Sequence, residues 1–219
     1  MAQQAECTVF GYPPDCLSLY DGGERNDGVY VIRPDGQTSV NAFCDMSNGG
    51  WTVFQSHANG DVDLATASWS EMLAGLGSPT GDHWLGLTYI HLLTWRDSLI
   101  YFDLVLLNGS QIYFQYSNFS VGNSSTMFKM TVGEGYQSNA YSYVEYEGFY
   151  QHDLMKFTAV DKDNDMYYAN CALSYGPWWH RNCGIFGSFN GNFHDMNFWN
   201  VPGEGRVYVK KTMIKLRRR

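Results

Sequence analysis

The amino-acid sequence predicts a single domain of the α+β class, with a mixed, mostly antiparallel sheet, short helices and a long irregular segment. Short runs rich in β-branched and aromatic residues are separated by Gly, Pro, Asn and Asp turns, which is the pattern of strands and hairpins. Helix-capping residues precede two short apolar stretches. Residues 148–200 show almost no periodicity, and 44% of the 219 residues are hydrophobic, enough for one sizeable core.

The domain boundaries follow from the first residues. Residues 1–15 carry Cys7 and the pair Pro13-Pro14, and we expect them to be a tether. Residues 16–219 contain no internal repeat and no linker. We therefore expect them to form one globular unit.

The first strands are expected between residues 29 and 55. Residues 29–32, 40–46 and 51–55 are three strand-like runs separated by turns that contain glycine. The next two segments favour helices instead. Ser68 and Glu71 form a capping box for a helix that should end at Gly77, and a second short helix should run from Thr88 to Trp95.

The clearest hairpin comes later in the chain. Residues 99–107 and 111–116 are strand-like and are joined across Asn108-Gly109, the dipeptide that best tolerates a type I′ turn. Residues 206–216 return to a strand pattern. We expect this last strand to close the sheet.

Five cysteines without a C-x-x-C motif or a zinc-type spacing predict disulfide bonds. The first hairpin brings Cys16 close to Cys44, which predicts a local disulfide. Cys171 and Cys183 bracket an aromatic-rich loop that a bond between them would close. Cys7 is left over on the tether, so we expect an interchain disulfide that links copies of the chain, with a free or capped thiol as the alternative.

Disulfide bonds indicate an oxidising compartment. Three glycosylation motifs, at Asn108, Asn118 and Asn123, indicate the same compartment. No apolar run approaches the ~20 residues of a membrane span, and residues 1–6 are not a signal peptide. We therefore expect a secreted glycoprotein in its mature form.

The charge is unevenly distributed. The net charge is −8, but seven of the 14 basic residues lie in 206–219, and all 22 acidic residues precede them. The acidic body is unsuited to binding nucleic acid and favours a bound divalent cation. The basic end is either a solubilising tail or a contact for an anionic partner.

One acidic segment has the composition of a Ca²⁺ site, because Asp161, Asp163 and Asp165 place three carboxylates at alternate positions. An EF-hand is excluded, since its sixth and twelfth positions would be Met166 and Ala172 instead of Gly and Glu. The remaining ligands would be backbone carbonyls or water. A solvated acidic turn is the alternative.

Signatures of catalysis are absent from the sequence: there is no G-x-S-x-G, H-E-x-x-H, Walker loop or G-x-G-x-x-G. We therefore expect a binding protein and not an enzyme. His180 is of interest because it follows two tryptophans and precedes Asn182-Cys183. Its alternative interpretation is a surface histidine packed on an aromatic ring.

A dozen short motifs occur in the order seen in fibrinogen-related domains. Those in the first half are Asp15-Cys16, Gly28-Val-Tyr-Val-Ile32, Phe43-Cys-Asp-Met46, Gly49-Gly-Trp-Thr-Val-Phe-Gln55, His83-Trp-Leu-Gly86 and His91-Leu-Leu-Thr94. Those in the second half are Lys156-Phe-Thr158, Asp161 to Asp165, Asn170-Cys171-Ala172, Trp178-Trp179, Asn182-Cys183 and Asn190-Gly191. The sequence therefore resembles the fibrinogen C-terminal globular domain from Cys16 to about Leu216.

The resemblance implies two disulfides and one calcium ion. The disulfides are Cys16 to Cys44 and Cys171 to Cys183. The implied calcium ligands are the carboxylates of Asp163 and Asp165 and the backbone carbonyls of Tyr167 and Ala169.

Members of this family such as ficolins and tachylectins are secreted recognition lectins that bind acetylated sugars and other acetyl groups beside this calcium. The matching positions here are Tyr175, Trp179, His180, Arg181, Asn182 and Cys183. The peptide before the second cysteine is commonly cis in the family, which implies a cis bond at Asn182-Cys183. Phe193 is the nearest candidate for an aromatic wall of the pocket.

The sequence departs from the family pattern around this pocket. Gly184 replaces a residue that is often His in acetyl-binding members, and the segment 192–206 is several residues shorter than usual. The resemblance implies a secreted calcium-binding lectin for acetylated carbohydrates, acting in innate defence as a homo-oligomer. The alternative is a structural or adhesive protein whose same face, or basic end, binds other protein chains and builds assemblies.

Overall fold

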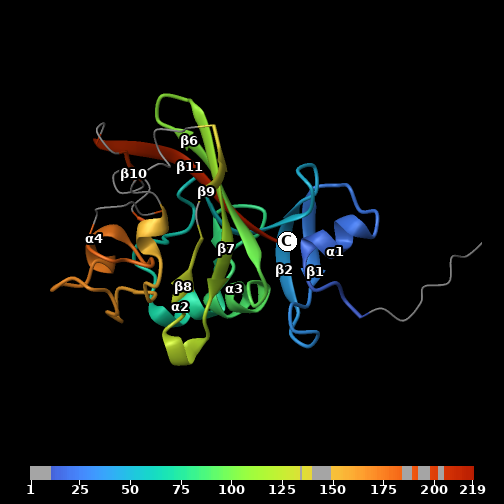
Figure 1. Cartoon of the computed structure of the whole chain (residues 1–219), viewed down its shortest axis with the longest axis horizontal. Helices are drawn as coiled ribbons and strands as arrows, with labels where there is room; N and C mark the ends of the chain where they lie inside the picture. The colour runs from blue at the N-terminus through green and yellow to red at the C-terminus, as the bar shows by residue number, and fades with distance from the viewer. Residues whose placement is uncertain (1–10, 134, 140–148, 184–188, 192–197, 202–204) are drawn as a thin grey trace, which may run out of the picture.

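The computed structural model describes residues 11–133, 135–139, 149–183, 189–191, 198–201 and 205–219, and its strands form an antiparallel sheet with short helices around it (Figure 1). The strands are β1 (Gly28–Ile32), β2 (Val40–Asp45), β3 (Trp51–His57), β4 (Leu76–Gly77), β5 (His83–Trp84), β6 (Ser98–Leu106), β7 (Gln111–Val121), β8 (Met130–Thr131), β9 (Gly135–Ser138), β10 (Phe198–Val201) and β11 (Gly205–Arg218). The helices are α1 (Cys16–Asp21), α2 (Trp69–Ala74), α3 (Leu87–Leu93) and α4 (Ala172–Tyr175), with 3-10 turns η1 (Ser124–Thr126) and η3 (Phe149–His152). The predicted α+β class is confirmed.

The C-terminal strand β11 lies in the middle of the sheet. The strand order is β1-β2-β3-β11-β6-β7-β8. Thr212 of β11 is opposite His57 of β3 on one side and opposite Leu104 of β6 on the other, and both pairings are antiparallel. The predicted last strand is confirmed, and it joins the two halves of the sheet.

The predicted hairpins form, although one turn differs from expectation. β1 and β2 pair so that Ile32 is opposite Val40. Between β6 and β7 the N–H of Gly109 donates to the carbonyl of Leu106, and Gly109 is the residue of this turn with a positive φ. A type I′ turn needs two such residues, so the connection is a three-residue loop with a left-handed glycine.

The capping box predicted at the start of α2 is present. The side chain of Ser68 accepts the N–H of Glu71, and the carboxylate of Glu71 accepts the N–H of Ser68 at 2.8 Å. The helix ends at Gly75, where φ is 92° and an added Cβ would lie 2.5 Å from the carbonyl oxygen of Leu85. The expected end at Gly77 was therefore two residues late.

The N-terminal end of the described chain contacts the first hairpin. Asp15 caps α1, a helix that the sequence patterns did not predict. The carbonyl of Pro13 accepts the N–H of Arg33 at 2.8 Å. The predicted disulfide Cys16–Cys44 is present, with its Cα atoms 5.4 Å apart, so α1 is attached to β2.

Buried aromatic side chains join the sheet to the irregular second half of the chain. Trp84 packs edge-on against Phe54, with ring centroids 5.5 Å apart, and its ring is 6.3 Å from that of Trp178 and 6.0 Å from that of Trp179. Phe157 packs 4.9 Å from Trp179. Burial of each large apolar ring contributes about 1.5–3 kcal/mol, so this cluster fixes residues 157–179 to the sheet.

Four of the basic residues near the C-terminus bond to other parts of the domain. The partners are Asp45 for Lys215, the carbonyl of Gly49 for Arg217 (3.2 Å), Asp15 for Arg218 (2.8 Å) and Asp97 for Arg219 (3.2 Å). The interpretation of the basic end as a solubilising tail is wrong for these residues, because they hold β11 to its neighbours.

The ion pair between Lys215 and Asp45 is buried, with the two residues 3% and 5% exposed. The ammonium group also lies 4.7 Å from the centroid of the Tyr101 ring. A side-chain N–H of Asn48 donates to Asp45 at 2.8 Å. Such a pair is costly to break on one side, since the remaining charge stays buried.

Replacing Asp45 with Asn should therefore lower the free energy of unfolding by about 3 kcal/mol. The double variant Asp45→Asn/Lys215→Met should recover much of that loss, because it removes both charges of the pair. Urea denaturation of the parent and the two variants at neutral pH measures both effects. A single variant as stable as the parent would contradict the structural role of this pair.

Candidate functional site

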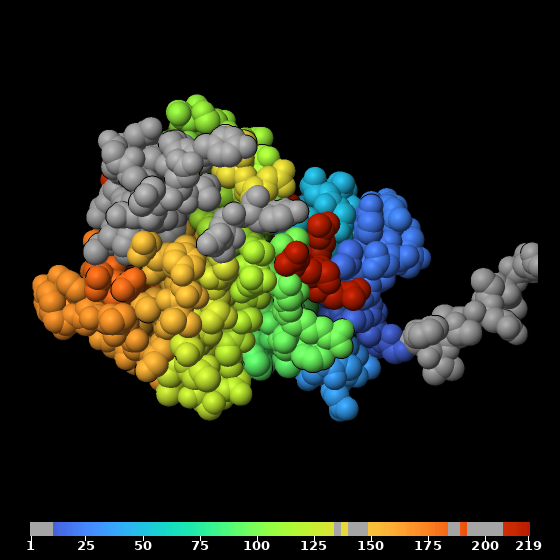
Figure 2. Space-filling view, viewed as in Figure 1, coloured from blue at the N-terminus to red at the C-terminus, as the bar shows by residue number. Residues whose placement is uncertain are grey.

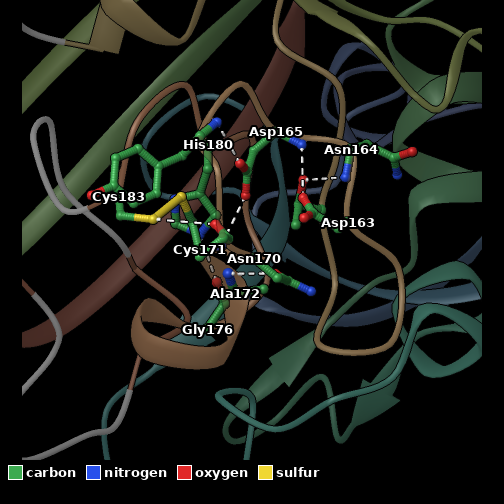
Figure 3. Close-up of a disulfide and its surroundings, with 12 residues drawn as sticks. Asp163, Asn164, Asp165, Asn170, Cys171, Ala172, Gly176, His180 and Cys183 are labelled. Carbon is green, nitrogen blue, oxygen red and sulfur yellow. Dashed lines mark hydrogen bonds between the residues drawn. A yellow bond between two sulfur atoms is a disulfide. The ribbon is translucent and has the colours of Figure 1, made fainter.

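The irregular segment 158–183 is closed at two points. The N–H groups of Thr158 and Trp178 each donate to the carbonyl of the other, at 2.9 and 3.1 Å. The predicted disulfide Cys171–Cys183 is present, with its Cα atoms 4.9 Å apart, and Figure 3 shows it beside the acidic residues of the segment. These closures give fixed positions to a chain with little secondary structure.

The short helix α4 follows Cys171 and carries Tyr175. It ends at Gly176, where φ is 75° and an added Cβ would lie 2.1 Å from the carbonyl oxygen of Asn190. The side-chain amide of Asn190, itself buried, donates to the carbonyl of Pro177 at 3.1 Å. Glycine is therefore required at 176, and the end of α4 is held against a buried amide.

The first carboxylate of the acidic segment is used by the fold. Asp161 accepts the N–H of Trp69, the first residue of α2, at 2.6 Å. The ammonium of Lys162 lies 4.1 Å from the centroid of the Trp69 ring. These contacts tie the segment to α2 and leave Asp163 and Asp165 as the carboxylates available to a cation.

Asp163 and Asp165 lie next to each other (Figure 3). Asp165 accepts the N–H groups of Tyr167 (2.8 Å) and Cys171 (2.9 Å), and Asp163 accepts the N–H of Asp165 at 3.3 Å. Burial raises the pKa of Asp165 and the charge of Asp163 raises it further, while the two N–H donors lower it. A cation beside these carboxylates would favour the ionised form of both.

The residues of this loop fit a hard divalent cation that is completed by backbone oxygens. Within the described parts of the chain, no three His, Cys, Asp or Glu side chains gather into a metal cluster. Carbonyls would have to supply the other ligands, as the resemblance implies for Tyr167 and Ala169. The carbonyl oxygen of Ala169 is 3.7 Å from the sulfur of Cys183, so the expected ligand set adjoins the disulfide.

Tyr175 and His180 lie together, with ring centroids 6.5 Å apart. His180 is 2% exposed, and its Nε2 is 2.7 Å from the carbonyl oxygen of Gly176. Burial lowers the pKa of His180 to about 4. The ring is therefore neutral at pH 7 and Nε2–H donates to Gly176, so the alternative of a surface histidine is wrong.

Trp179 lies in the core. It is fully buried, and its Nε1–H donates to the carbonyl of Phe128 at 2.7 Å. The ring offers no surface to a ligand, so Trp179 does not line the acetyl-binding pocket as the resemblance implied. Its role is to anchor the residue that follows it, His180.

The next turn connects the two parts of the candidate site. Arg181 is exposed, and its carbonyl accepts the N–H of Met166 from the acidic segment at 3.1 Å. No cis peptide bond occurs among the described residues, so the Asn182–Cys183 bond is trans and the implied cis bond is wrong. Phe193 lies outside the described residues.

Recesses formed by described residues include two away from this segment. One of about 300 Å³ lies beside β4 and Trp84, and one of about 170 Å³ is lined in part by Phe43, Val53 and Met213. Neither includes a residue of the predicted ligand set. The residues that indicate a binding site therefore lie in the segment 163–183.

The remaining sequence predictions concern the surface. Asn108, Asn118 and Asn123 are exposed, which is compatible with the glycosylation that their motifs predict. Cys7 lies outside the described residues, and its interchain bond stays a prediction. None of the helices in the described part of the chain is long and apolar enough to span a membrane.

The model of one protein family, the C-terminal globular domain of fibrinogen beta and gamma chains, matches residues 12–216. The chain belongs to this family. The fibrinogen-like globe domain of human ANGPTL6 has the same fold, with a TM-score of 0.85 at 26% identity over 98% of this chain and 99% of that one. The resemblance seen in the sequence and the expected fold are both confirmed.

Relatives of different lengths share this domain. Fibrinogen-like protein A of Apostichopus parvimensis is 33% identical over 95% of this chain and 76% of that protein. Microfibril-associated glycoprotein 4 of Homo sapiens is 33% identical over 94% of the chain and 85% of that protein. Fibroleukin of Homo sapiens is 35% identical over 85% of the chain, which spans only 43% of that protein.

The buried histidine gives a prediction for the pH dependence of stability. An unfolded histidine takes up a proton near pH 6.5, whereas His180 in the fold does so only near pH 4. The unfolded state therefore binds more protons between these values, and stability should fall as the pH is lowered through them. The loss of unfolding free energy caused by His180 should be absent above pH 6.5 and reach about 3 kcal/mol near pH 4.

The variant His180→Gln tests this prediction, because glutamine keeps an N–H donor for Gly176 and does not titrate. Burial also lowers the pKa of His57 and His83, so the variant should retain part of the acid sensitivity and show a flatter curve than the parent. Urea denaturation between pH 7 and pH 4 measures the two curves. Parallel curves would show that His180 does not contribute as proposed.

Proposed function

We propose that the chain is a secreted, calcium-binding and non-catalytic recognition domain for acetylated carbohydrates or other acetyl groups. The observation that carries the proposal is the link between the acidic residues and the aromatic residue of the site. Asp165 accepts the N–H of Cys171, and Cys171 begins the turn of helix that presents Tyr175. A cation held by the acidic residues would therefore fix the position of Tyr175.

Asp163 and Asp165 would hold the calcium with their carboxylates, and Tyr167 and Ala169 with their carbonyls. The ion would supply positive charge that offsets the repulsion between the two carboxylates. The loop would then keep one conformation and present the same surface to each ligand.

Acetyl recognition needs an apolar surface for the methyl group and an N–H donor for the carbonyl oxygen. Tyr175 is half-buried and supports the first requirement. The turn 181–183 would supply the donor, positioned by the hydrogen bond of His180 to Gly176. Because His180 is neutral and already donates its proton, its part is to position this turn.

A site this small gains only a few kcal/mol, so one copy should bind a sugar with a dissociation constant of about millimolar to high micromolar. Useful binding would then need several linked copies. An interchain disulfide at Cys7 is the link that we propose. Defence against surfaces that display many acetylated sugars is a role that suits such a multivalent protein.

A second candidate function is adhesion to other protein chains. Met166 and Leu173 are 65% and 71% exposed beside the site, more apolar surface than a small acetyl group would cover. Microfibril-associated glycoprotein 4 is one relative, and Tenascin-R of Gallus gallus is another, 35% identical over 80% of this chain, which spans only 13% of that protein. Under this second hypothesis the same face would bind a protein and build an assembly.

Calcium should raise the melting temperature of the parent by several degrees, because the ion would bind the folded loop and not the unfolded chain. Asp163→Asn should abolish this response, and without calcium it should melt at the same temperature as the parent or slightly above, since it removes the repulsion on Asp165. Calorimetry with calcium or EDTA measures both. Asp61→Asn, at an exposed acid outside the loop, is the control that should keep the response.

Titration of N-acetylglucosamine should give saturable NMR shifts in the parent, and Tyr175→Ala should weaken binding at least tenfold through loss of the ring. Tyr12→Ala, at an exposed tyrosine in the first described residues, should bind like the parent. If the parent shows no shifts at tens of millimolar sugar, the lectin proposal fails and adhesion becomes the better account.

A further inference from the structure

Tyr168 is the most exposed large hydrophobic side chain among the described residues, with 89% of its surface in contact with solvent. Its ring lies 4.2 Å from that of Tyr167, which is 39% exposed. Exposed aromatic pairs are unusual on a monomeric surface, because their apolar area gains nothing from water. The ring of Tyr167 supports that of Tyr168, and most of the Tyr168 surface is open to a ligand.

The tyrosine pair is continuous with the candidate site. The N–H of Tyr167 donates to Asp165, and Met166 donates to the carbonyl of Arg181 in the turn after His180. Asp165 also accepts the N–H of Cys171, which begins the helix that carries Tyr175, so one carboxylate joins the tyrosine pair to the candidate site.

The segment that carries the pair lies at one end of the molecule. In Figure 2 the orange segment that contains it forms the end opposite the blue N-terminal residues of the domain. Copies that are joined through their N-terminal ends would direct this surface outward.

The surroundings favour a neutral, hydroxyl-rich occupant. The ammonium of Lys162 faces the ring of Trp69, and Arg181 is a single exposed cation, so the described residues around the pair offer no basic cluster for an anionic lipid surface. A stable protein interface needs about 20–30 residues on each side, so a protein partner would have to cover Met166, Leu173 and further surface besides the tyrosine pair. The C–H face of a sugar ring matches an aromatic ring, and its hydroxyl groups match the phenolic oxygens of the pair.

We propose that Tyr168, supported by Tyr167, is a stacking platform for the second sugar ring of an oligosaccharide whose acetylated end binds beside Tyr175. The inference rests on the proposed function and goes beyond it by naming the size of the ligand. The chain would prefer an oligosaccharide of acetylated sugars to the single sugar. Tyr168 would be a specificity-determining residue with no part in binding the acetyl group.

The test compares N-acetylglucosamine with its β-linked trimer by NMR titration. The parent should bind the trimer about three- to tenfold more tightly than the monomer, the range expected for one aromatic stacking contact. Tyr168→Ala should lose this preference and leave monomer binding unchanged. Tyr168→Phe should keep the preference, and so should the control Tyr12→Ala.

Several outcomes would overturn the inference. A parent that binds the monomer but binds the trimer no more tightly would remove the platform and leave the proposed function standing, as would a full trimer preference in Tyr168→Ala. Equal losses for both sugars in Tyr168→Ala would assign Tyr168 to the acetyl site. A parent that binds neither sugar would end both proposals, and calcium-dependent sedimentation with phosphatidylcholine–phosphatidylserine vesicles that Tyr168→Ala abolishes would assign the surface to membranes.

Discussion

Trp178 and Trp179 are buried side by side against Trp84 and Phe157, and this packing holds in place a segment that has little secondary structure of its own. Burial of these rings also buries nearby polar groups, which need hydrogen-bond partners. The N–H and carbonyl groups of Thr158 and Trp178 bond to each other, and the indole N–H of Trp179 donates to the carbonyl of Phe128. A loop anchored in this way can present ligand groups with the precision that binding requires.

The same anchoring explains why the site lies where the chain is least regular. The disulfide Cys171–Cys183 and Gly176 set the direction of the backbone, and the buried His180 fixes the turn that follows. The carboxylates remain at the surface, where a cation can reach them. Rigidity comes from the core beneath the loop, and function is left to the few side chains on its outer side.

Much of the fold could be predicted because its signals are local. The capping box at Ser68 and the turn dipeptide Asn108-Gly109 each involve neighbouring residues, and the short hairpin of β1 and β2 accounts for the closeness of Cys16 and Cys44. The central position of β11 could not be predicted, since strand order depends on long-range pairing. The basic end was misinterpreted for the same reason, because the partners of Lys215 and Arg218 lie far away in the sequence.

The candidate site was predicted less completely. Its acidic residues and disulfide follow from composition and resemblance, but burial decides the roles of the aromatic and histidine side chains. Trp179 belongs to the core, and His180 is a buried donor. Tyr168 was not singled out, because no sequence pattern distinguishes an exposed tyrosine from a buried one.

We propose that calcium orders the loop through Asp165. The amides of Tyr167 and Cys171 both donate to this carboxylate, so their hydrogen exchange reports directly on whether it is held. Measured with calcium and with EDTA, both amides should exchange more slowly when calcium is present, while amides in the middle of β6 should not change. Equal exchange of the Tyr167 and Cys171 amides in the two conditions would contradict the account.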